Sequence, residues 1–401
     1  MHHQTLKLIL MLLALTGPAA WGFAQQTVTI AATGQGTVTA DKTEARQGEL
    51  VTLTVSAAEG WMLRRERLAV EMVTDAEGDT AHLTRSAAPL VGSYVSVSRQ
   101  GDGLYTFRMP DTRVEVRAAF VAYTTQTATI PVTVTDGSTS TAAEATITIA
   151  VEDETDEAVI SNVTLPGTDS HQTVSVVIPE TVTDADGQEH PVTAIGSGAL
   201  TDCQGVTDIY LPDTDEPLVI ADDALTTGDG SGVPTIHTPL TLLDDYALMT
   251  GLSQHYATGN ITATAQARNR YWTFSCGVDV RLPQGTTFFI CRQSSTTGIE
   301  IIEQHDAVIL ANNGVLIVCD DDRVHDYEVT VSPSGDRPTG TVPSTHNARS
   351  YEGNLLEPVI KNRHYDAGGY YVMVDNAFHP IVQEGRDVEL PACKAVLHLE
   401  E

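Results

Sequence analysis

Apolar and polar residues alternate along most of the chain, as they do in β-strands that bury one face. Residues 27–122 open with TVTIAATGQGTVTADKTEARQGELVTLTV, where β-forming residues alternate with polar ones and glycines at 34, 36 and 48 mark turns. The alternation returns at 130–134 and 145–150, on either side of a stretch at 137–143 that indicates a turn or linker. The pattern predicts a mainly β, multidomain protein whose first unit is made of short antiparallel strands.

The end of this first unit has the most specific pattern. Tyr105, Phe107 and Met109 alternate before Pro110, and alternate apolar residues continue from 114 to 120 in VEVRAAF. Together with the opening strands, this ending resembles the divergent InlB-type B repeat, a small β module of bacterial surface proteins. The middle of the unit is longer and more charged than that family's pattern. The resemblance implies a β module at 27–122, followed by a linker and leading strands at 123–154.

A repeat follows at 155–255. AIGSGAL at 194–200 aligns with VIADDAL at 219–225 and LLDDYAL at 242–248, at offsets of 25 and 23 residues, and each segment carries an apolar pair, a three-residue spacer and Ala-Leu. A second row consists of Val176, Ile209 and Ile236, each three residues before a proline. Two rows with one period predict a solenoid, in which each unit stacks its apolar edge on its neighbours and each strand ends at its proline. The predicted structural positions of this ladder are Ile195, Ala199, Leu200, Cys203, Ile209, Ile220, Ala224, Leu225, Ile236, Leu243, Ala247 and Leu248.

The repeat resembles the BspA-type leucine-rich repeat, whose units run approximately V-T-x-I-G-x-x-A-F-x-x-C-x-x-L-T-x-I-x-L-P. Most positions of that unit are matched between Val192 and Pro212, while Leu200 replaces the aromatic residue and Val206 the leucine. Cys203 is expected to fill the inside of a bend, since no basic neighbour would activate its thiol. The match weakens towards residue 248, so we expect a degenerate last unit.

Residues 260–401 contain short runs of β-formers separated by Gly, Pro and Asp, which favours a β-sandwich-like domain. Because a repeat stack exposes an apolar face at its end, we expect this domain to cap the repeats. The resemblance to C-terminal β domains of exported bacterial proteins implies no activity for it.

The first residues, MHHQTLKLILMLLALTGPAAWGFAQQ, have the form of a secretory signal peptide cleaved after Ala24, because the apolar run is far shorter than the about 20 residues of a membrane span. No cysteine directly follows the cleavage site to accept a lipid, the first being Cys203, so we expect a secreted or cell-surface protein without a direct membrane span. With 53 acidic and 22 basic residues, the formal charge of -31 argues against a nucleic-acid partner. Five cysteines are too few for a disulfide scaffold, although one bridge among Cys276, Cys291, Cys319 and Cys393 stays open.

No catalytic constellation is recognisable. H-E-x-x-H, G-x-S-x-G and P-loop patterns are absent, and carboxylate pairs mean little in so acidic a chain. DADGQE at 184–189 and CDDDRVHD at 319–326 suggest calcium ligands at first, but the first lacks EF-hand spacing and indicates a turn, and the second is expected to be a solvated loop. We therefore expect no catalytic residue, no metal and no cofactor.

Two functions remain open: a noncatalytic adhesin-like protein that binds an extracellular protein or glycan, and an exported carbohydrate-active enzyme with an unrecognised active site. The modular resemblances favour the first, as an analogy between folds. Side chains alternate along a strand, so if Ile209 and Ile236 point inward, their neighbours point outward. These outward positions, with Tyr210 and His237 at equivalent places in adjacent units, are the predicted ligand-binding residues: Asp208, Tyr210, Thr235 and His237.

Overall fold

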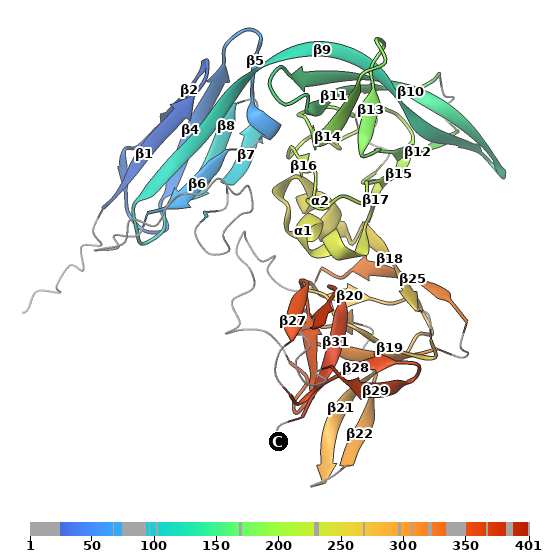
Figure 1. Cartoon of the computed structure of the whole chain (residues 1–401). Coiled ribbons are helices and arrows are strands. Elements are labelled where there is room, and N and C mark those ends of the chain that lie inside the picture. The colour runs from blue at the N-terminus through green and yellow to red at the C-terminus, as the bar shows by residue number, and fades with distance from the viewer. Residues whose placement is uncertain are drawn as a thin grey trace, which may run out of the picture.

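The computed structural model describes residues 25–66, 68–73, 94–95, 97–101, 103–167, 171–227, 232–267, 269–295, 298–305, 308–319, 323–333, 350–365, 368–381 and 388–399. The predicted signal peptide at 1–24 lies outside these residues. The described chain is mainly β and forms several sheets, with two short α-helices (Figure 1). Among the described residues, no helix is long and apolar enough to cross a membrane.

The first module packs two sheets around its own core. One sheet has the order β2 (Gly36–Ala40), β4 (Leu50–Ala57), β8 (Leu104–Arg108), β7 (Val97–Gly101). The facing sheet is built on the first part of β9 (Val114–Asp136). β1 (Gln26–Thr33), β5 (Trp61–Leu63) and β6 (Ala69–Met72) pair with β9, and β3 (Glu44–Ala45) pairs with β1. Phe107, Met109, Val114 and Val116 are among the buried residues between them.

The prediction of antiparallel strands alone was wrong for this module. β1 and β9 pair in parallel, from Val28 opposite Val114 to Thr33 opposite Ala119. The chain passes through the opposing sheet between these two strands, and such a crossover allows them to run in the same direction. Sequence periodicity does not reveal strand direction, because it depends only on which face is buried.

The second half of β9 leaves the module and enters the next region. It forms a long hairpin with β10 (Thr139–Glu152), joined by Gly137 and Ser138, and Gly137 has a φ of 56° (Figure 1). The strands expected at 130–134 and 145–150 lie within β9 and β10, but the linker expected in 123–154 is mostly strand as well, and the turn expected at 137–143 is shorter than predicted. β-branched threonines support extended structure even where few large apolar residues are present, which explains the error.

The repeat region contains two runs of parallel strands. The first run is β11 (Ala158–Thr164), β14 (Glu189–Ile195) and β16 (Val219–Ile220), with β13 (Thr181–Thr183) antiparallel to β14. The second run is β12 (Thr173–Val177), β15 (Val206–Tyr210), β17 (Thr235–Thr238) and β18 (Ile261–Ala267). In the second run Val176 lies opposite Ile209, and Ile209 lies opposite Ile236.

These runs are not an isolated stack with a core of its own. At one end β12 pairs antiparallel with β9, and at the other β18 pairs antiparallel with β25 (His325–Val331). A single buried cluster extends from Ala128 on β9 to Cys393 near the C-terminus. The repeat strands are thus part of a larger β structure rather than a separate solenoid.

The predicted ladder positions lie in the interior. All except Leu248 are at most 3% exposed, and Leu248 is partly buried against the same cluster. The first two Ala-Leu pairs lie in turns after β14 and β16, whereas the third lies in α1 (Leu243–Leu248), preceded by the 3-10 turn η2 (Leu240–Leu242). Asp244 and Asp245 occupy the first turn of α1, where carboxylates favour a helix N-terminus. A second 3-10 turn, η3 (Thr250–Leu252), and α2 (Ser253–Thr258) lead from α1 to β18.

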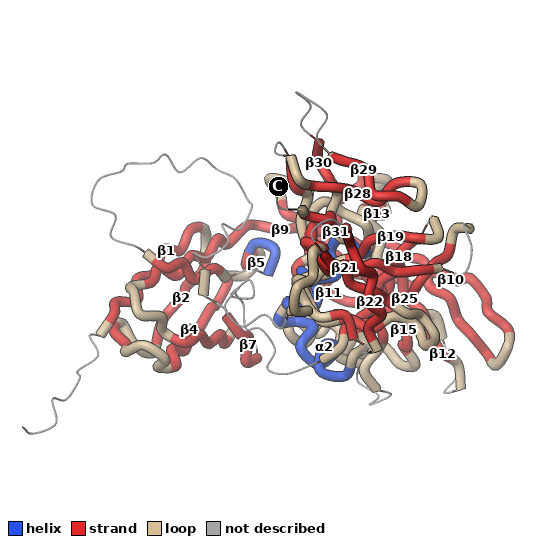
Figure 2. The backbone as a smooth tube through the Cα atoms, turned by 90° about the horizontal axis from the view of Figure 1, so that it is seen from below, coloured by secondary structure: helices blue, strands red, loops and turns tan. Residues whose placement is uncertain are grey.

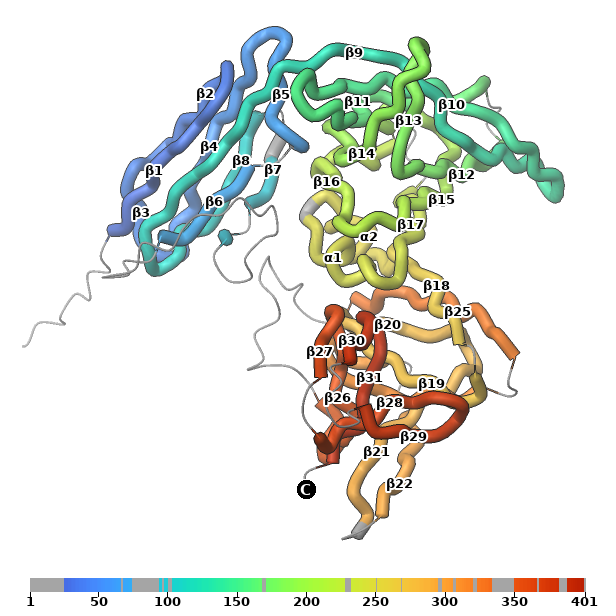
Figure 3. Tube along the Cα trace, in the orientation of Figure 1, coloured from blue at the N-terminus to red at the C-terminus, as the bar shows by residue number. Residues whose placement is uncertain are grey.

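The C-terminal region contains two four-stranded sheets. One has the order β19 (Tyr271–Phe274), β24 (Val315–Val318), β21 (Phe288–Ser295), β22 (Gly298–Gln304), and the other β26 (Leu356–Val359), β31 (Lys394–His398), β28 (Tyr370–Val374), β29 (Ala377–Pro380). Residues from both sheets form a common buried cluster: Cys291, Leu316, Leu356, Ala395 and Leu397. The remaining strands are β20 (Val280–Arg281), β23 (Val308–Ile309), β27 (Arg363–Tyr365) and β30 (Val388–Leu390). The hairpin of β21 and β22 projects away from the rest of the molecule (Figures 1 and 3).

The first module stands to one side of the remaining chain and touches it through β5, β7 and the 3-10 turn η1 (Arg64–Glu66) (Figure 2). Arg64 is bonded to the buried Glu152 on β10, and Arg65 Nε donates to Glu157 Oε2 at 2.8 Å. The backbone N–H of Arg99 donates to Asp222 Oδ2 at 2.6 Å. Charged hydrogen bonds therefore fix how the module meets the repeat region.

Candidate functional site

The predicted outward positions form one row on the second run of parallel strands. Val177 on β12 lies opposite Tyr210 on β15, Tyr210 opposite His237 on β17, and His237 opposite Thr262 on β18. Val177 is 37% and Tyr210 40% exposed, while Asp208 and Thr235 are half-buried in the neighbouring row. The structure thus brings the four predicted binding residues together on one face of the sheet.

Tyr210 and His237 form a stacked pair. Their ring centroids are 4.2 Å apart and their planes differ by 8°. Because the parallel strands pair in register, the two rings stack face to face on neighbouring strands. Their edges, rather than their faces, are therefore exposed to solvent. Each ring also restricts the other, so the pair needs little further ordering when a partner binds.

A chain of hydrogen bonds fixes the imidazole of His237. Its Nε2 lies 2.8 Å from Asp208 Oδ1, and its Nδ1 lies 3.2 Å from the hydroxyl oxygen of Thr262. An ionised carboxylate can only accept, so Nε2–H donates to Asp208, and the second ring nitrogen, Nδ1, shares a hydrogen bond with the Thr262 hydroxyl. Asp208 Oδ2 also accepts from Thr207 Oγ1 at 2.8 Å.

The hydroxyl of Tyr210 remains available. Partial burial, together with the negative charges of Asp208 and Glu328, raises the pKa of Tyr210, so the phenol keeps its proton and can donate it in a hydrogen bond. Among the described residues this hydroxyl has no hydrogen-bond partner. The surface therefore offers one donor beside two carboxylates, which favours neutral or basic partners.

The order carboxylate, imidazole, hydroxyl resembles the chain of groups in a hydrolase triad. Thr262, which would be the nucleophile, is only 4% exposed, and a nucleophile must reach its substrate. The chain Asp208, His237, Thr262 thus orients the imidazole rather than activating a hydroxyl for attack.

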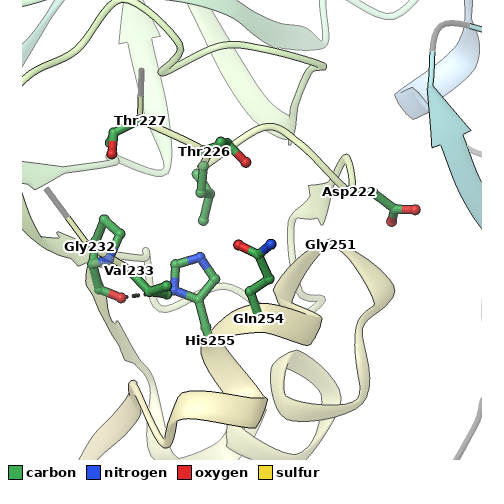
Figure 4. Close-up of a pocket in the computed structure, with 10 residues that line it drawn as sticks. Asp222, Thr226, Thr227, Gly232, Val233, Gly251, Gln254 and His255 are labelled. Carbon is green, nitrogen blue, oxygen red and sulfur yellow. Dashed lines mark hydrogen bonds between the residues drawn. The ribbon is translucent and has the colours of Figure 1, made fainter. Parts of the chain in front are cut away.

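A small cavity lies at the other edge of the repeat region, between α2 and the turn after β16 (Figure 4). It measures about 50 Å³ and is lined by polar groups that include Asp222, Thr227, Gln254 and His255. His255 Nδ1 donates to the carbonyl of Pro234 at 2.8 Å, and burial lowers the pKa of this histidine, which favours its neutral form. Liquid water occupies about 30 Å³ per molecule, so this volume suits water rather than an organic ligand.

The candidate calcium segments have different positions. In DADGQE, Asp184 Oδ1 accepts the backbone N–H groups of Asp186 and Gln188, both at 2.9 Å, and Oδ2 lies 3.2 Å from His190 Nε2. Its carboxylate is thus used to close the turn between β13 and β14. Residues 320–322 of the other segment lie outside the described residues. Within the described part of the chain, no group of three or more His, Cys, Asp or Glu residues is arranged to hold a metal ion.

All five cysteines are free and buried, including Cys203, whose Sγ donates to the carbonyl of Val163 at 3.3 Å inside the bend. Burial beside Asp244 raises the pKa of the Cys276 thiol well above its usual value, and burial raises that of Cys393 to about 12. These thiols are not poised as nucleophiles.

Sequence reasoning missed two parts of this chemistry. Thr262 follows Ile261, which lies 25 residues after Ile236, so continuing the repeat period by one unit would have placed it beside His237. The other is a second stacked pair, Tyr370 and His398, with centroids 4.3 Å apart, in which Glu357 Oε1 lies 2.7 Å from His398 Nδ1. Three different strands supply that second cluster, and no local pattern marks it.

Comparison of the chain with family models, curated proteins and solved structures finds no match in any of the three.

Proposed function

We propose that this chain is an exported or cell-surface, noncatalytic binding protein, in which BspA-type leucine-rich repeats hold an adhesin-like contact surface for an extracellular protein. The observation that carries the proposal is the stacked, partly exposed pair of Tyr210 and His237 on the outward row of the repeat strands. Supporting the repeat assignment is the parallel, in-register pairing of strands that occupy equivalent positions in successive units.

A protein fits this surface better than a glycan. Sugars stack on the open face of an aromatic ring, but one face of Tyr210 is occupied by His237 and the other side is next to Val177. What remains exposed is a ring edge, a hydroxyl donor and the apolar side chain of Val177. Aromatic residues that combine an apolar body with a polar tip are frequent anchors of protein contacts.

The acidic side chains around the pair favour a basic partner. Partial burial raises the pKa of Tyr210, the negative charges of Asp208 and Glu328 add to this shift, and the whole chain carries a formal charge of -31. Complementary charge speeds association and suppresses wrong partners. The partner surface is thus expected to be neutral to basic and to offer a hydrogen-bond acceptor for Tyr210.

Export is tested by the mass of the protein recovered outside the cell. Cleavage after Ala24 leaves Gln25, or its cyclised form, at the N-terminus. A mature protein that retains its leader would contradict the export proposal.

Binding is tested by screening the mature chain against extracellular protein and glycan arrays, and then measuring the affinity of each hit for Tyr210→Ala/His237→Ala. Loss of two central anchors is expected to weaken a specific contact by at least about 2 kcal/mol, or about thirtyfold. Tyr210→Phe isolates the hydroxyl.

The matched control is Tyr370→Ala/His398→Ala, which removes the same stacked chemistry from the C-terminal region. If this control weakens binding and the repeat variant does not, the contact surface lies on the C-terminal region. Hits confined to glycans would contradict the choice of a protein partner.

A further inference from the structure

The edge strand β22 is uncovered on both its side-chain face and its backbone. It is the last strand of the sheet β19, β24, β21, β22, and it lies in the hairpin that projects from the molecule (Figures 1 and 3). Ile299 is 42% and Ile301 52% exposed, whereas Cys291, directly opposite Ile301 on β21, is fully buried. The opposing sheet therefore covers β21 but stops short of β22.

The hydrogen bonds of Cys291 fix which backbone groups of β22 are free. The N–H of Cys291 donates to Asn354 Oδ1 at 3.3 Å, and its carbonyl accepts from the N–H of Leu355 at 2.7 Å. Both groups thus point away from β22, so Cys291 and Ile301 form a non-hydrogen-bonded antiparallel pair. In such a pair the N–H and C=O of Ile301 point away from β21, towards the open edge.

The same geometry applies two residues along the strand in each direction. Ile299 lies opposite Gln293 and Glu303 opposite Phe289, so their backbone groups also face outward, and the Glu303 carbonyl accepts a 3.3 Å bond from its neighbour Gln304. No described residue pairs with the backbone N–H and C=O groups of Ile299 and Ile301. An exposed edge of this kind is a template for one more strand.

The charged residues of β22 determine which kind of strand can pair with its open edge. β22 contains Glu300 and Glu303 and no basic residue, and the only described cation opposite it, Arg292, donates to the carbonyl of Glu352. His305 Nδ1 lies 3.9 Å from Glu303 Oε1, and its side chain is 87% exposed. A second copy would bring two more glutamates and another charge of -31 to the edge, which disfavours self-pairing.

We propose that β22 binds an extended segment of a partner protein by β-strand addition, and that this segment alternates apolar with basic residues. Ile299 and Ile301 would contact its apolar side chains, Glu300 and Glu303 would pair with its basic ones, and the outward backbone groups would continue the ladder. This surface is separate from the row at Tyr210, and the proposal stands whether or not that row binds a partner.

A designed peptide tests this directly. In the antiparallel register, acetyl-Thr-Lys-Thr-Val-Lys-Val-Thr-amide places valines opposite Ile301 and Ile299 and lysines opposite Glu303 and Glu300. Fluorescence anisotropy of the labelled peptide should show saturable binding to the full chain, weakened at least about tenfold when glutamate replaces lysine in the peptide. Absence of binding at millimolar concentration would overturn the proposal.

Ile301→Pro is the sharpest variant. Proline removes an outward N–H while leaving every bond between β21 and β22 intact, and edge strands tolerate it. Peptide binding should be lost, with the circular dichroism spectrum unchanged; Ile299→Lys/Ile301→Lys should act likewise through charge. Leu104→Lys, at a 40% exposed strand position in the first module, is the matched control and should bind normally.

Two outcomes identify another occupant or none. Concentration-dependent dimerisation of the unaltered chain, abolished by Ile301→Pro, would show that a second copy covers the edge and would overturn the choice of partner. Peptide binding that survives both β22 variants would place the peptide elsewhere and would also overturn the proposal.

Discussion

Replacing Ile209 by Asp tests whether the repeat strands share one continuous interior. Ile209 is fully buried and lies between Val176 and Ile236 in the parallel run, both of them also fully buried. Removing its side chain forfeits about 1.5 to 3 kcal/mol of burial, and truncation to alanine alone typically costs about 2 to 5 kcal/mol with the cavity included. A carboxylate at that position adds the cost of an unpaired buried polar group.

The assay is urea unfolding followed through Trp272, which is 6% exposed and belongs to the same buried cluster as Ile209. Trp61 belongs to the first module, so a Trp61→Phe background of the chain from Gln25 onward isolates the signal. With a denaturant slope of about 2 kcal/mol per molar, a loss of about 3 kcal/mol lowers the midpoint by about 1.5 M. Ile209→Asp should lower it at least this far.

Ile301→Asp is the matched control, because the same substitution is made on a strand where isoleucine is 52% exposed. It should change the free energy of unfolding by no more than about 0.5 kcal/mol. An unchanged midpoint for Ile209→Asp would mean that the strand register, and with it the outward direction of Tyr210, is wrong.

Three further predictions concern the thiols, the junction of the first module and a buried histidine. Ellman's reagent should find almost no thiol in the native chain and five after denaturation, since all five cysteines are buried and free; a lower number after denaturation would reveal a disulfide. Arg65→Ala should speed hydrogen exchange in β5 and at the start of β11 by breaking the bond to Glu157, whereas Arg117→Ala, whose carboxylate partners lie within the first module, should leave exchange in β11 unchanged. Burial lowers the folded-state pKa of His255 below its unfolded value near 6.5, so its contribution to the free energy of unfolding is complete above that pH and is lost as the pH falls below it. His255→Asn should therefore reduce the loss of unfolding free energy between pH 7 and 5. His305→Asn, at an 87% exposed position, is the control and should leave that loss unchanged.

Local periodicity was sufficient to place side chains on the correct face of the repeat strands. The two-residue alternation at 208–211 separates the buried Ile209 from the exposed Tyr210, and the repeat period places His237 beside it. These relations are local or recur at a fixed spacing, so they can be read from one sequence.

The pairing of distant strands, and the residues that this pairing brings together, could not be predicted from the sequence. They depend on strand order and direction, which periodicity does not encode. β9 continues from the first module into the repeat region because threonine-rich segments extend without large apolar residues, and no boundary signal distinguishes them from a linker. Glu328 reaches the neighbourhood of Tyr210 only because β25 pairs with β18, across 66 residues of chain from Thr262. The second stacked pair, at Tyr370 and His398, requires the order of three strands.

Acidic residues favour basic partners at both proposed binding surfaces, the row at Tyr210 and the edge of β22. The negative charges of Asp208 and Glu328 act on the phenol of Tyr210, and Glu300 and Glu303 lie on β22 itself. Both proposed surfaces therefore favour basic groups, although one presents side chains and the other a strand edge. Interactions between exposed charges are screened over about 8 Å at physiological ionic strength, whereas aromatic packing and backbone hydrogen bonds are much less affected. Charge should therefore set the rate at which partners arrive, while the ring pair and the strand edge determine how long they stay.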